Sequence, residues 1–232
     1  MATSAPTVPT HIGYILDGNR RWAKEHGLPT YEGHLAGVTA LEEVIEASID
    51  AGVKYISFYT WSTENWSRAE EEVRATMRIV RGLFKRELKR LLQEGCRFVA
   101  LGDMETIPDD IRKMIREAEE SSKDGTRATL AMCFNYGGQQ ELVHAMQSII
   151  ESGMPAEQVT PAIVAEHLYC PEVPPCDLVV RTSGEQRLSN FMLWRSAYAE
   201  FLFLDKFWPD MRKEDVTAII EEYNRRGRRF GG

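Results

Sequence analysis

The segment HIGYILDGNRR, residues 11–21, is the part of the chain most informative about the fold. Its first seven residues are apolar almost throughout, which is typical of a strand covered on both faces of a sheet. The stretch ends in Asp17–Gly18 and continues into Arg20 and Arg21. This order predicts a buried strand, then a turn, then a helix that begins with basic residues.

The rest of the chain repeats this alternation of short apolar runs and helical patterns. Further strands are predicted at 54–61, 96–102, 127–134, 177–182 and 201–205. Apolar residues recur at helical spacing over 38–49, 70–92, 111–118, 142–150 and 216–223, and a looser stretch at 152–175 contains five prolines and a short helix at 163–168. The pattern predicts one α/β domain over 11–232, with a mostly parallel six-stranded sheet and helices on both faces. Residues 1–10 are expected to form a disordered lead-in.

Composition excludes several classes of protein. The 232 residues carry a net charge of −7, which argues against a surface that binds nucleic acid as a whole. No apolar run approaches the length of a membrane span, and no signal peptide is recognisable. The four cysteines show no CxxC pair, so reduced thiols and a cytoplasmic location are expected.

Polar clusters follow the predicted strands, where ligands bind in open parallel sheets. They occupy 17–22, 62–68, 135–138 and 181–189, and three of the four contain arginine in a chain that is acidic overall. Each has an ordinary interpretation as well, such as an Asp–Gly turn at 17–18 or a helix cap at 62–64. Taken together, the arginines favour a pocket for one or two polyanionic groups.

Metal and nucleotide motifs narrow the chemistry further. The five histidines lack zinc-type spacing. Asp17 and Glu200 are better suited to Mg²⁺, which binds one or two carboxylates together with substrate phosphates. Neither GxGxxG nor a Walker loop is present, which argues against a dinucleotide enzyme or a P-loop NTPase.

Several motifs in this order resemble the cis-prenyltransferases of the undecaprenyl diphosphate synthase family. They are HIGYILDGNRRWAKEHG (11–27), GHLAG (33–37), YTWSTENWSR (59–68), FNYGG (134–138), RTSGEQRLSNFMLWRSAYAEFLF (181–203), WPD (208–210) and RRFGG (228–232). The resemblance covers residues 11 to 231. It implies that isopentenyl diphosphate is condensed onto an allylic diphosphate, geranyl or farnesyl diphosphate, with a new cis double bond at each step.

The resemblance also implies roles for individual residues. Asp17 and Asn65 are the implied catalytic residues, Asp17 engaging Mg²⁺ and the allylic diphosphate and Asn65 assisting proton removal. Glu200 would complete the Mg²⁺ site. Substrate-binding residues would be Gly18, Asn19, Arg20, Arg21, Trp22, His34, Ser62, Thr63, Glu64, Trp66, Arg68, Arg181, Arg187, Leu188 and Ser189. Within this set, Arg181, Arg187 and Ser189 are assigned to isopentenyl diphosphate.

A growing prenyl tail needs an apolar tunnel, expected between the second strand and the helices at 38–51 and 73–92. Thr60, Trp61 and Phe134 are bulkier than the usual family residues, and a medium to undecaprenyl-length product is expected. Thr30 stands where the family usually has arginine, and Arg20 is the candidate substitute. The resemblance further implies a homodimer, with the tail Arg229–Gly231 near the partner's active site. Release of the product is expected to involve peripheral contact with the inner face of the membrane.

Two other functions remain open from the sequence. One is a catalytically silent subunit that supports another prenyltransferase, although such subunits tend to lose the aspartate and arginines that are present here. The other keeps the fold and joins two five-carbon units in an irregular, branched coupling. Analysis of the products would separate the three.

Overall fold

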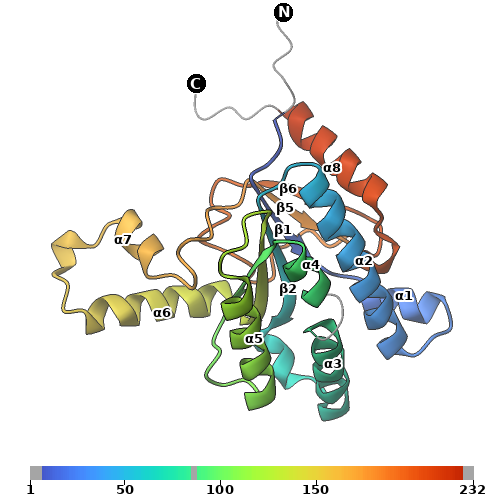
Figure 1. The fold of residues 1–232 in the computed structure, drawn as a ribbon, viewed down its shortest axis with the longest axis horizontal. Coiled ribbons are helices and arrows are strands. Elements are labelled where there is room, and N and C mark those ends of the chain that lie inside the picture. The colour runs from blue at the N-terminus through green and yellow to red at the C-terminus, as the bar shows by residue number, and fades with distance from the viewer. Residues whose placement is uncertain (1–6, 85–87, 227–232) are drawn as a thin grey trace, which may run out of the picture.

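A central sheet of six strands organises the chain, of which the computed structural model describes residues 7–84 and 88–226 (Figure 1). The strands are β1 His11–Ile15, β2 Tyr55–Ser62, β3 Arg97–Leu101, β4 Thr129–Tyr136, β5 Leu178–Arg181 and β6 Glu200–Phe203. Their order is β3-β4-β2-β1-β5-β6, and every neighbouring pair is parallel. All six predicted strands are confirmed, and the sheet is wholly rather than mostly parallel.

Eight α-helices lie in the described part of the chain. They are α1 Asn19–Glu25, α2 Thr30–Asp50, α3 Glu70–Leu83, α4 Lys89–Gln93, α5 Asp109–Ser122, α6 Gly138–Glu151, α7 Pro161–Glu166 and α8 Lys213–Arg226. Short 3₁₀ helices include η1 Thr63–Ser67 and η4 Trp208–Asp210. The helix expected over 70–92 is described as α3 and α4, and residues 85–87 between them lie outside the described part.

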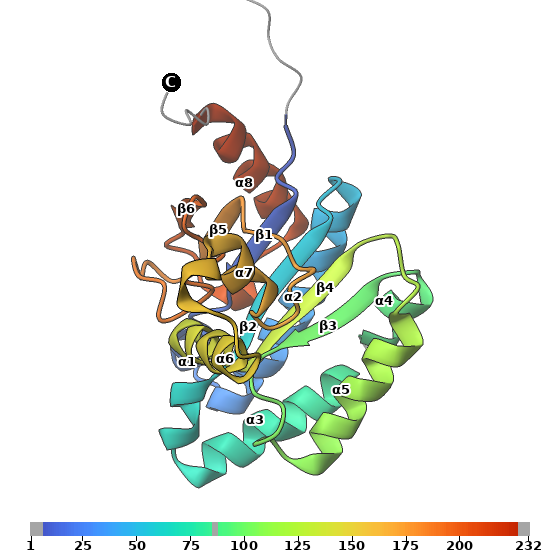
Figure 2. The same cartoon turned by 90° about the vertical axis from the view of Figure 1, so that its left-hand side faces the viewer.

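The two faces of the sheet are covered differently (Figure 2). Alternate strand residues such as Ile12 and Tyr14 face a large core formed with α2, α3, α5 and α8. Their neighbours, such as Ile15, face a smaller core completed by Phe191 and Met192. Helices therefore dominate one face, whereas on the other an irregular segment completes the core and α6 and α7 lie on the same side (Figure 2).

Helix α2 begins at Thr30, earlier than its apolar pattern predicts. Its first turns contain Gly33 and Gly37, which add no apolar side chain to that pattern. A Cβ at Gly33 would lie 2.1 Å from the backbone oxygen of Asn19, and one at Gly37 would lie 2.4 Å from Asn19 Oδ1. Both glycines therefore allow α1 to pack directly against α2. The same lack of side chains hides these turns from a search for helical periodicity.

Both ends of the chain lie partly outside the described residues. Of the expected lead-in, residues 1–6 are outside, but Thr7 donates its backbone N–H to Asn224 Oδ1 over 2.8 Å. Thr10 donates to Asp177 Oδ2 over 2.7 Å. Residues 7–10 are therefore fixed to the domain. The tail Arg229–Gly231 also lies outside the described residues.

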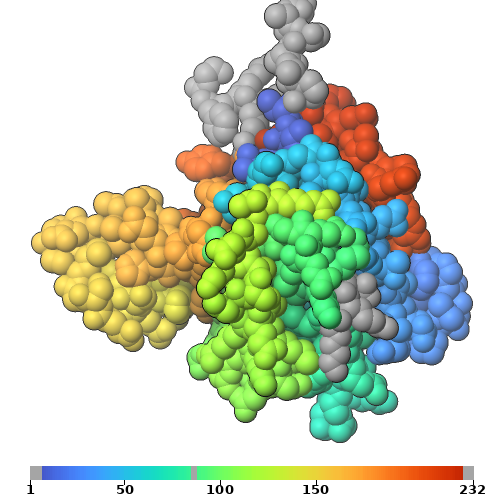
Figure 3. Space-filling model, in the orientation of Figure 1, coloured from blue at the N-terminus to red at the C-terminus, as the bar shows by residue number. Residues whose placement is uncertain are grey.

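Helices α6 and α7 project from the body of the molecule (Figures 1 and 3). On α6, the side chains of Val143, Met146 and Ile150 are 51%, 57% and 76% exposed. Their spacing puts them along one side of the helix. Across the described segments, no helix combines the length and apolar character needed to cross a membrane.

Candidate active site

The sheet changes its direction of growth between β1 and β5. Strands β2, β3 and β4 lie on one side of β1, and β5 and β6 lie on the other. In open parallel sheets, this switch point opens a crevice at the carboxyl ends of the strands. Ile15 and Arg181 are register partners there. The hydroxyl of Thr182 donates to the backbone oxygen of Asp17 over 2.6 Å, which fixes the two strand ends to each other.

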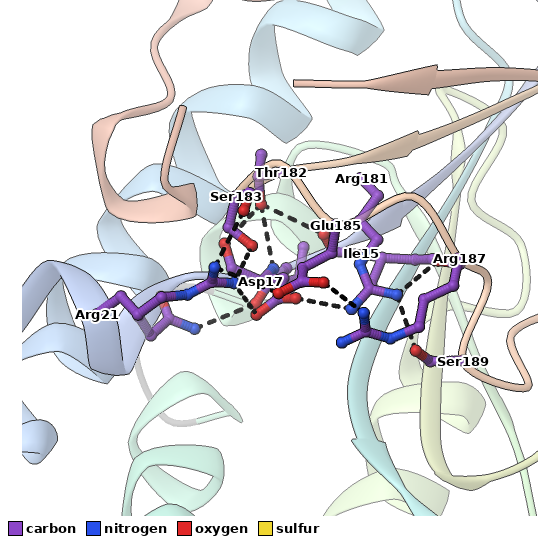
Figure 4. A network of polar contacts seen from close by, with 11 residues as sticks. Ile15, Asp17, Arg21, Arg181, Thr182, Ser183, Glu185, Arg187 and Ser189 are labelled. Atoms are coloured by element: carbon purple, nitrogen blue, oxygen red, sulfur yellow. Dashed lines mark hydrogen bonds and ion pairs between the residues drawn. The ribbon is translucent and has the colours of Figure 1, made fainter. Parts of the chain in front are cut away.

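Asp17 and Arg181 form the polar centre of this crevice (Figure 4). Arg181 Nη2 donates to Asp17 Oδ2 over 2.7 Å, and the two side chains are 5% and 29% exposed respectively. Arg21 Nη2 lies 3.5 Å from Asp17 Oδ1. One carboxylate therefore stands between two guanidinium groups that come from different elements.

These guanidinium groups decide the charge of Asp17. Burial alone would raise the pKa of Asp17, but the hydrogen bond and charge of Arg181, with the charge of Arg21, outweigh burial and hold this pKa below its ordinary value. Asp17 is thus ionised at neutral pH. No group of three or more His, Cys, Asp or Glu side chains in the described residues could hold a metal ion. A divalent cation at Asp17 would take its other ligands from substrate and water, an arrangement that suits Mg²⁺.

The loop after β5 brings a second set of polar groups to the crevice. Arg181 Nη1 donates to Ser189 Oγ over 2.8 Å and to the backbone oxygen of Arg187 over 2.5 Å. The guanidinium of Arg187 is 60% exposed and pairs with Glu185. Arg181 thus orders the loop from inside while Arg187 stays accessible to a ligand.

A basic hollow of about 780 Å³ lies over α1 and the start of α2, and Asp17 lies on its wall. Its charged lining also includes Arg20, Arg21, Lys24 and Arg68, with His34 beside them. Glu72 partly offsets this charge, lying 3.5 Å from Arg20 and 3.0 Å from Arg68. Burial and the charges of Arg68 and Arg20 lower the pKa of His34, so its ring is neutral at pH 7. The excess of positive charge suits a polyanionic ligand.

A second cavity, of about 380 Å³, has a polar mouth at the same aspartate and an apolar inner part between β2, α2 and α3, and is called the apolar cavity below. Its inner wall consists of Val38, Leu41, Ile79, Val80 and Leu83. Leu41 and Leu83 also line a smaller enclosed void beyond, together with Phe58 and Phe98. These two leucines therefore separate the cavity from the void.

Comparison with known proteins shows the family to which the chain belongs. The family model described as "Putative undecaprenyl diphosphate synthase" matches residues 15–231. The chain belongs to the undecaprenyl diphosphate synthase family. It is therefore an isoprenyl transferase, an enzyme that transfers prenyl groups.

Individual relatives of this isoprenyl transferase are similar over nearly the whole chain. An isoprenyl transferase of Agrobacterium fabrum is 40% identical over 99% of this chain and 94% of its own. A "ditrans,polycis-undecaprenyl-diphosphate synthase ((2E,6E)-farnesyl-diphosphate specific)" of Micrococcus luteus is 38% identical over 99% and 94%. A "trans,polycis-polyprenyl diphosphate synthase ((2Z,6E)-farnesyl diphosphate specific)" of Thermobifida fusca is 44% identical over 97% and 81%.

A solved structure supports the same fold for the isoprenyl transferase. Lavandulyl diphosphate synthase from Lavandula x intermedia, in complex with dimethylallyl diphosphate, superimposes with a TM-score of 0.93. It is 32% identical in sequence, and the match covers 97% of this chain and 99% of that one.

Most of the site residues predicted for the isoprenyl transferase line the apolar cavity, the basic hollow or both. They are Asp17, Gly18, Asn19, Arg20, Arg21, His34, Ser62, Asn65, Arg68, Arg181, Arg187 and Ser189. They come from four chain segments far apart in the sequence. The fold therefore brings together the residues that the sequence placed after separate strands.

Two predicted tryptophans line neither space. Trp22 donates from its ring nitrogen to Asp210 Oδ1 over 2.7 Å and so connects α1 to η4. Trp66 donates to Asn135 Oδ1 over 2.7 Å. In this structure both rings fix neighbouring backbone segments in place.

Three further predicted residues also lie outside the two spaces. Leu188 packs against the smaller core. Thr63 lines a separate hollow at the ends of β3 and β4. Glu64 accepts a hydrogen bond from Asn190 over 3.0 Å. A sequence motif marks these residues as neighbours of the site, but the fold decides which side chains reach it.

Glu200 requires a correction, because one chain does not bring it to Asp17. It is the first residue of β6 and pairs in register with Leu178, the first residue of β5. Arg181, beside Asp17, is three positions further along the strand, a displacement of about 10 Å. Glu200 instead lies 3.4 Å from Arg226 of α8. The two carboxylates of a single chain therefore share no metal ion.

Four residues that shape the site were not predicted as site residues, although each lies in one of the quoted motifs. The backbone oxygen of Ser183 accepts from Arg21 Nη1 over 3.1 Å, and Glu185 lies 3.4 Å from Arg21. Thr182 joins β1 to β5, as described above. Trp208 lines the apolar cavity and donates to the backbone oxygen of Gly37 over 2.8 Å. Thr182 ends a predicted strand, and Ser183 and Glu185 follow it, and that position was the signal available in the sequence.

Proposed function

We propose that this isoprenyl transferase condenses isopentenyl diphosphate with an allylic diphosphate and forms a cis-polyprenyl diphosphate. The observation that carries the proposal is that Asp17 lies where the basic hollow and the apolar cavity join. An allylic diphosphate has a polyanionic head and an apolar tail, and so matches both spaces. The names of the relatives from Micrococcus luteus and Thermobifida fusca support this reaction class.

The basic hollow is the proposed site of the allylic diphosphate. Cleavage of the allylic carbon–oxygen bond increases negative charge on the departing diphosphate, and fixed cationic donors stabilise that charge. Arg20 and Arg21 supply such donors from α1, and Arg68 supplies another from the segment after β2. Thr30 lines the same hollow but carries no charge. Arg20 therefore replaces the arginine that the family usually has at position 30.

Isopentenyl diphosphate is assigned to the loop after β5. Arg181, Arg187 and Ser189 line the cavity beside Asp17. Two diphosphates held on either side of Asp17 would bring the reacting carbons together and so reduce the entropic cost of the condensation. Asn65, whose Oδ1 accepts from the backbone N–H of Ser62 over 3.2 Å, lines the same cavity and is proposed to assist proton removal.

Mg²⁺ is the proposed cofactor, and the residues present fit it. Asp17 offers an ionised carboxylate, the oxygen ligand that Mg²⁺ prefers, and the diphosphates would supply further oxygens. The ion would supply Lewis-acid stabilisation of the diphosphate charge. Arg181 now occupies Asp17 Oδ2, so it would move toward a diphosphate when the ion binds to Asp17.

The prenyl tail is proposed to grow into the apolar cavity, toward Leu41 and Leu83. Each added five-carbon unit contributes several kcal/mol of burial, at about 0.8 kcal/mol per CH₂. The cavity of about 380 Å³ is small for a long product. A product of undecaprenyl length therefore requires the two leucines to move apart. Slow release of such a tail would be helped by peripheral contact with a membrane.

An irregular coupling of two five-carbon units is the second candidate function. The likeness in fold to lavandulyl diphosphate synthase favours it. The apolar cavity favours chain elongation instead, because five-carbon substrates have no long tail to bury. The silent-subunit alternative is opposed by the intact pair of Asp17 and Arg181.

A homodimer is the proposed assembly, and the exposed apolar side of α6 supports it. Val143, Met146 and Ile150 form a contiguous stripe that a second copy would cover. Glu200 retains a proposed role in metal binding only if a second copy brings it to the partner's Asp17. The tail Arg229–Gly231, outside the described residues, retains its proposed place near the partner's site.

Product analysis tests this proposal. Purified protein would be incubated with labelled isopentenyl diphosphate, Mg²⁺ and either geranyl or farnesyl diphosphate, and the products would be resolved by mass spectrometry. The proposal predicts a ladder that increases by five-carbon units. A branched ten-carbon product from dimethylallyl diphosphate alone would favour the irregular coupling, and no product with any starter would contradict both.

A further inference from the structure

Asn190 lies in the loop between β5 and β6, directly after Ser189. The loop is irregular, with positive φ angles at Ser183, Ser189, Asn190 and Met192. Asn190 has a φ of 65°, and asparagine tolerates this left-handed backbone conformation better than most residue types do. Something must nevertheless hold the loop in this shape, because consecutive residues with positive φ are costly.

The contacts of Asn190 show what holds the loop in this shape. Its backbone oxygen accepts from the N–H of Gly138 over 2.7 Å, and its Oδ1 accepts from the N–H of Gln139 over 2.8 Å. Its Nδ2 donates to Gln140 Oε1 and to Glu64 Oε1, both over 3.0 Å. Asn190 therefore accepts hydrogen bonds from the free N–H groups in the first turn of α6, and it also contacts Glu64 of η1.

The contact with Glu64 connects the two sides of the crevice. Glu64 precedes Asn65 on η1, whereas Asn190 follows Ser189, whose hydroxyl accepts from Arg181. A shift of Asn190 relative to Glu64 would therefore move the Ser189 side of the site away from the Asn65 side. Tyr59 of β2 adds a second connection, donating to the backbone oxygen of Ser189 over 3.4 Å.

We propose that Asn190 is a positioning residue, which sets the separation between the isopentenyl diphosphate loop and the η1 segment through its amide contact with Glu64. The inference rests on the proposed function for the identity of the ligand. It assigns Glu64 a place in that contact, which explains why this residue lies in a family motif without lining the cavity.

The Asn190→Asp substitution tests the contact with little other change. Aspartate also tolerates positive φ and keeps an oxygen for the N–H of Gln139. It replaces the donor toward Glu64 with a second carboxylate, which repels Glu64. We expect the KM for isopentenyl diphosphate and its Kd by calorimetry to rise about tenfold, the scale of losing one hydrogen bond to a charged group. The KM for the allylic substrate and the melting temperature should change little.

A second substitution provides the rescue. Glu64→Gln in the Asn190→Asp background puts an amide donor opposite the new carboxylate and restores a hydrogen bond with its direction reversed. We expect the double variant to bind isopentenyl diphosphate within about threefold of the Glu64→Gln single variant. Gln140→Ala, which removes only the other acceptor of the same amide, is the matched control and should leave the Kd unchanged.

The outcomes separate this inference from the function on which it rests. An unchanged Kd in Asn190→Asp, or a double variant as weak as Asn190→Asp, would overturn the positioning role. An equal loss of both substrates together with a lower melting temperature would also overturn it, because that result indicates a general structural role. If the wild-type protein neither binds nor incorporates isopentenyl diphosphate, the proposed function itself fails.

Discussion

Asp17 is the residue on which both halves of the site depend. Its carboxylate contacts Arg181 and Arg21, and it lies on the walls of both the basic hollow and the apolar cavity. Removal of the carboxylate would leave these arginines without their common partner. It would also remove the ionised oxygen ligand that Asp17 is proposed to offer to Mg²⁺.

Asp17→Ala is therefore predicted to reduce turnover at least a hundredfold, the scale seen when one preorganised electrostatic group is lost. Incorporation of labelled isopentenyl diphosphate measures the rate, and circular dichroism checks that the fold persists. Asp124→Ala, which removes an exposed carboxylate beyond α5, is the control and should retain full activity. A near-normal rate in Asp17→Ala would remove the catalytic assignment.

His11 shows a different effect of burial, on stability. It is fully buried, and its ring nitrogens contact Ser57 Oγ over 2.7 Å and the backbone oxygen of Pro174 over 2.8 Å. Burial lowers the pKa of His11 from 6.5 to about 4. Between these values the unfolded chain binds a proton that the folded chain does not, so stability is complete above pH 6.5 and falls as the pH decreases toward 4.

The free energy of unfolding is predicted to lose about 2 kcal/mol through His11 between pH 7.5 and pH 5. Urea unfolding of the wild type and of His11→Gln at both pH values measures this contribution, because the other titrating groups are common to both. The variant should show the smaller decrease. Equal decreases would mean that His11 titrates alike in the folded and unfolded chains.

Residue types and their position at the ends of strands were sufficient to predict that several polar clusters meet in one pocket. Asp17, Arg181 and Ser189 follow predicted strands and lie together in the structure. Trp22 and Glu200 could not be placed this way, because a side chain's direction and a strand's register depend on tertiary packing. Trp22 contacts Asp210, and Glu200 begins its strand at the opposite end of the sheet.

At the scale of elements, strands were easier to predict than helix boundaries. The buried strands are continuous apolar runs, and this pattern needs no tertiary information. The start of α2 was missed because Gly33 and Gly37 serve the packing of α1 rather than the periodicity of their own helix. The apolar stripe of α3 predicted a helix but did not reveal that Leu83 borders a cavity.

The packing of α3 against α2 is predicted to limit product length. Leu83→Ala would remove part of the partition between the apolar cavity and the void behind it, and should shift the product distribution to longer chains. Thr60→Leu, on the opposite wall from β2, adds bulk near the start of the cavity and should shorten them. Mass spectrometry of the polyprenyl products measures both shifts. Identical ladders in all three proteins would show that the tail follows another path.

At the scale of the whole molecule, the parallel topology explains where the site lies. The strand order places the switch point between β1 and β5, and Asp17 and Arg181 follow or end those two strands. The α/β class and the number of strands were predictable from alternation along the chain. The irregular cover on the second face was not, because residues 169–177 and 182–192, on either side of β5, have neither helical nor strand periodicity.

The exposed stripe on α6 belongs to this scale because the proposed homodimer would bury it. Met146→Lys combined with Ile150→Lys is predicted to convert a dimer into a monomer, since charged residues are costly in an apolar interface. Light scattering coupled to gel filtration measures the mass. Val8→Lys changes an exposed apolar residue far from α6 in the sequence and should leave the dimer intact. A double variant that remained dimeric would place the interface elsewhere.

A crystal structure with Mg²⁺, isopentenyl diphosphate and a non-cleavable allylic diphosphate is the decisive test of the proposed site. We predict one diphosphate against Arg20 and Arg21, the other against Arg181, Arg187 and Ser189, the metal ion on Asp17, and the prenyl tail directed toward Leu83. Both ligands bound elsewhere, with Asp17 and Arg181 still paired to each other, would contradict the account.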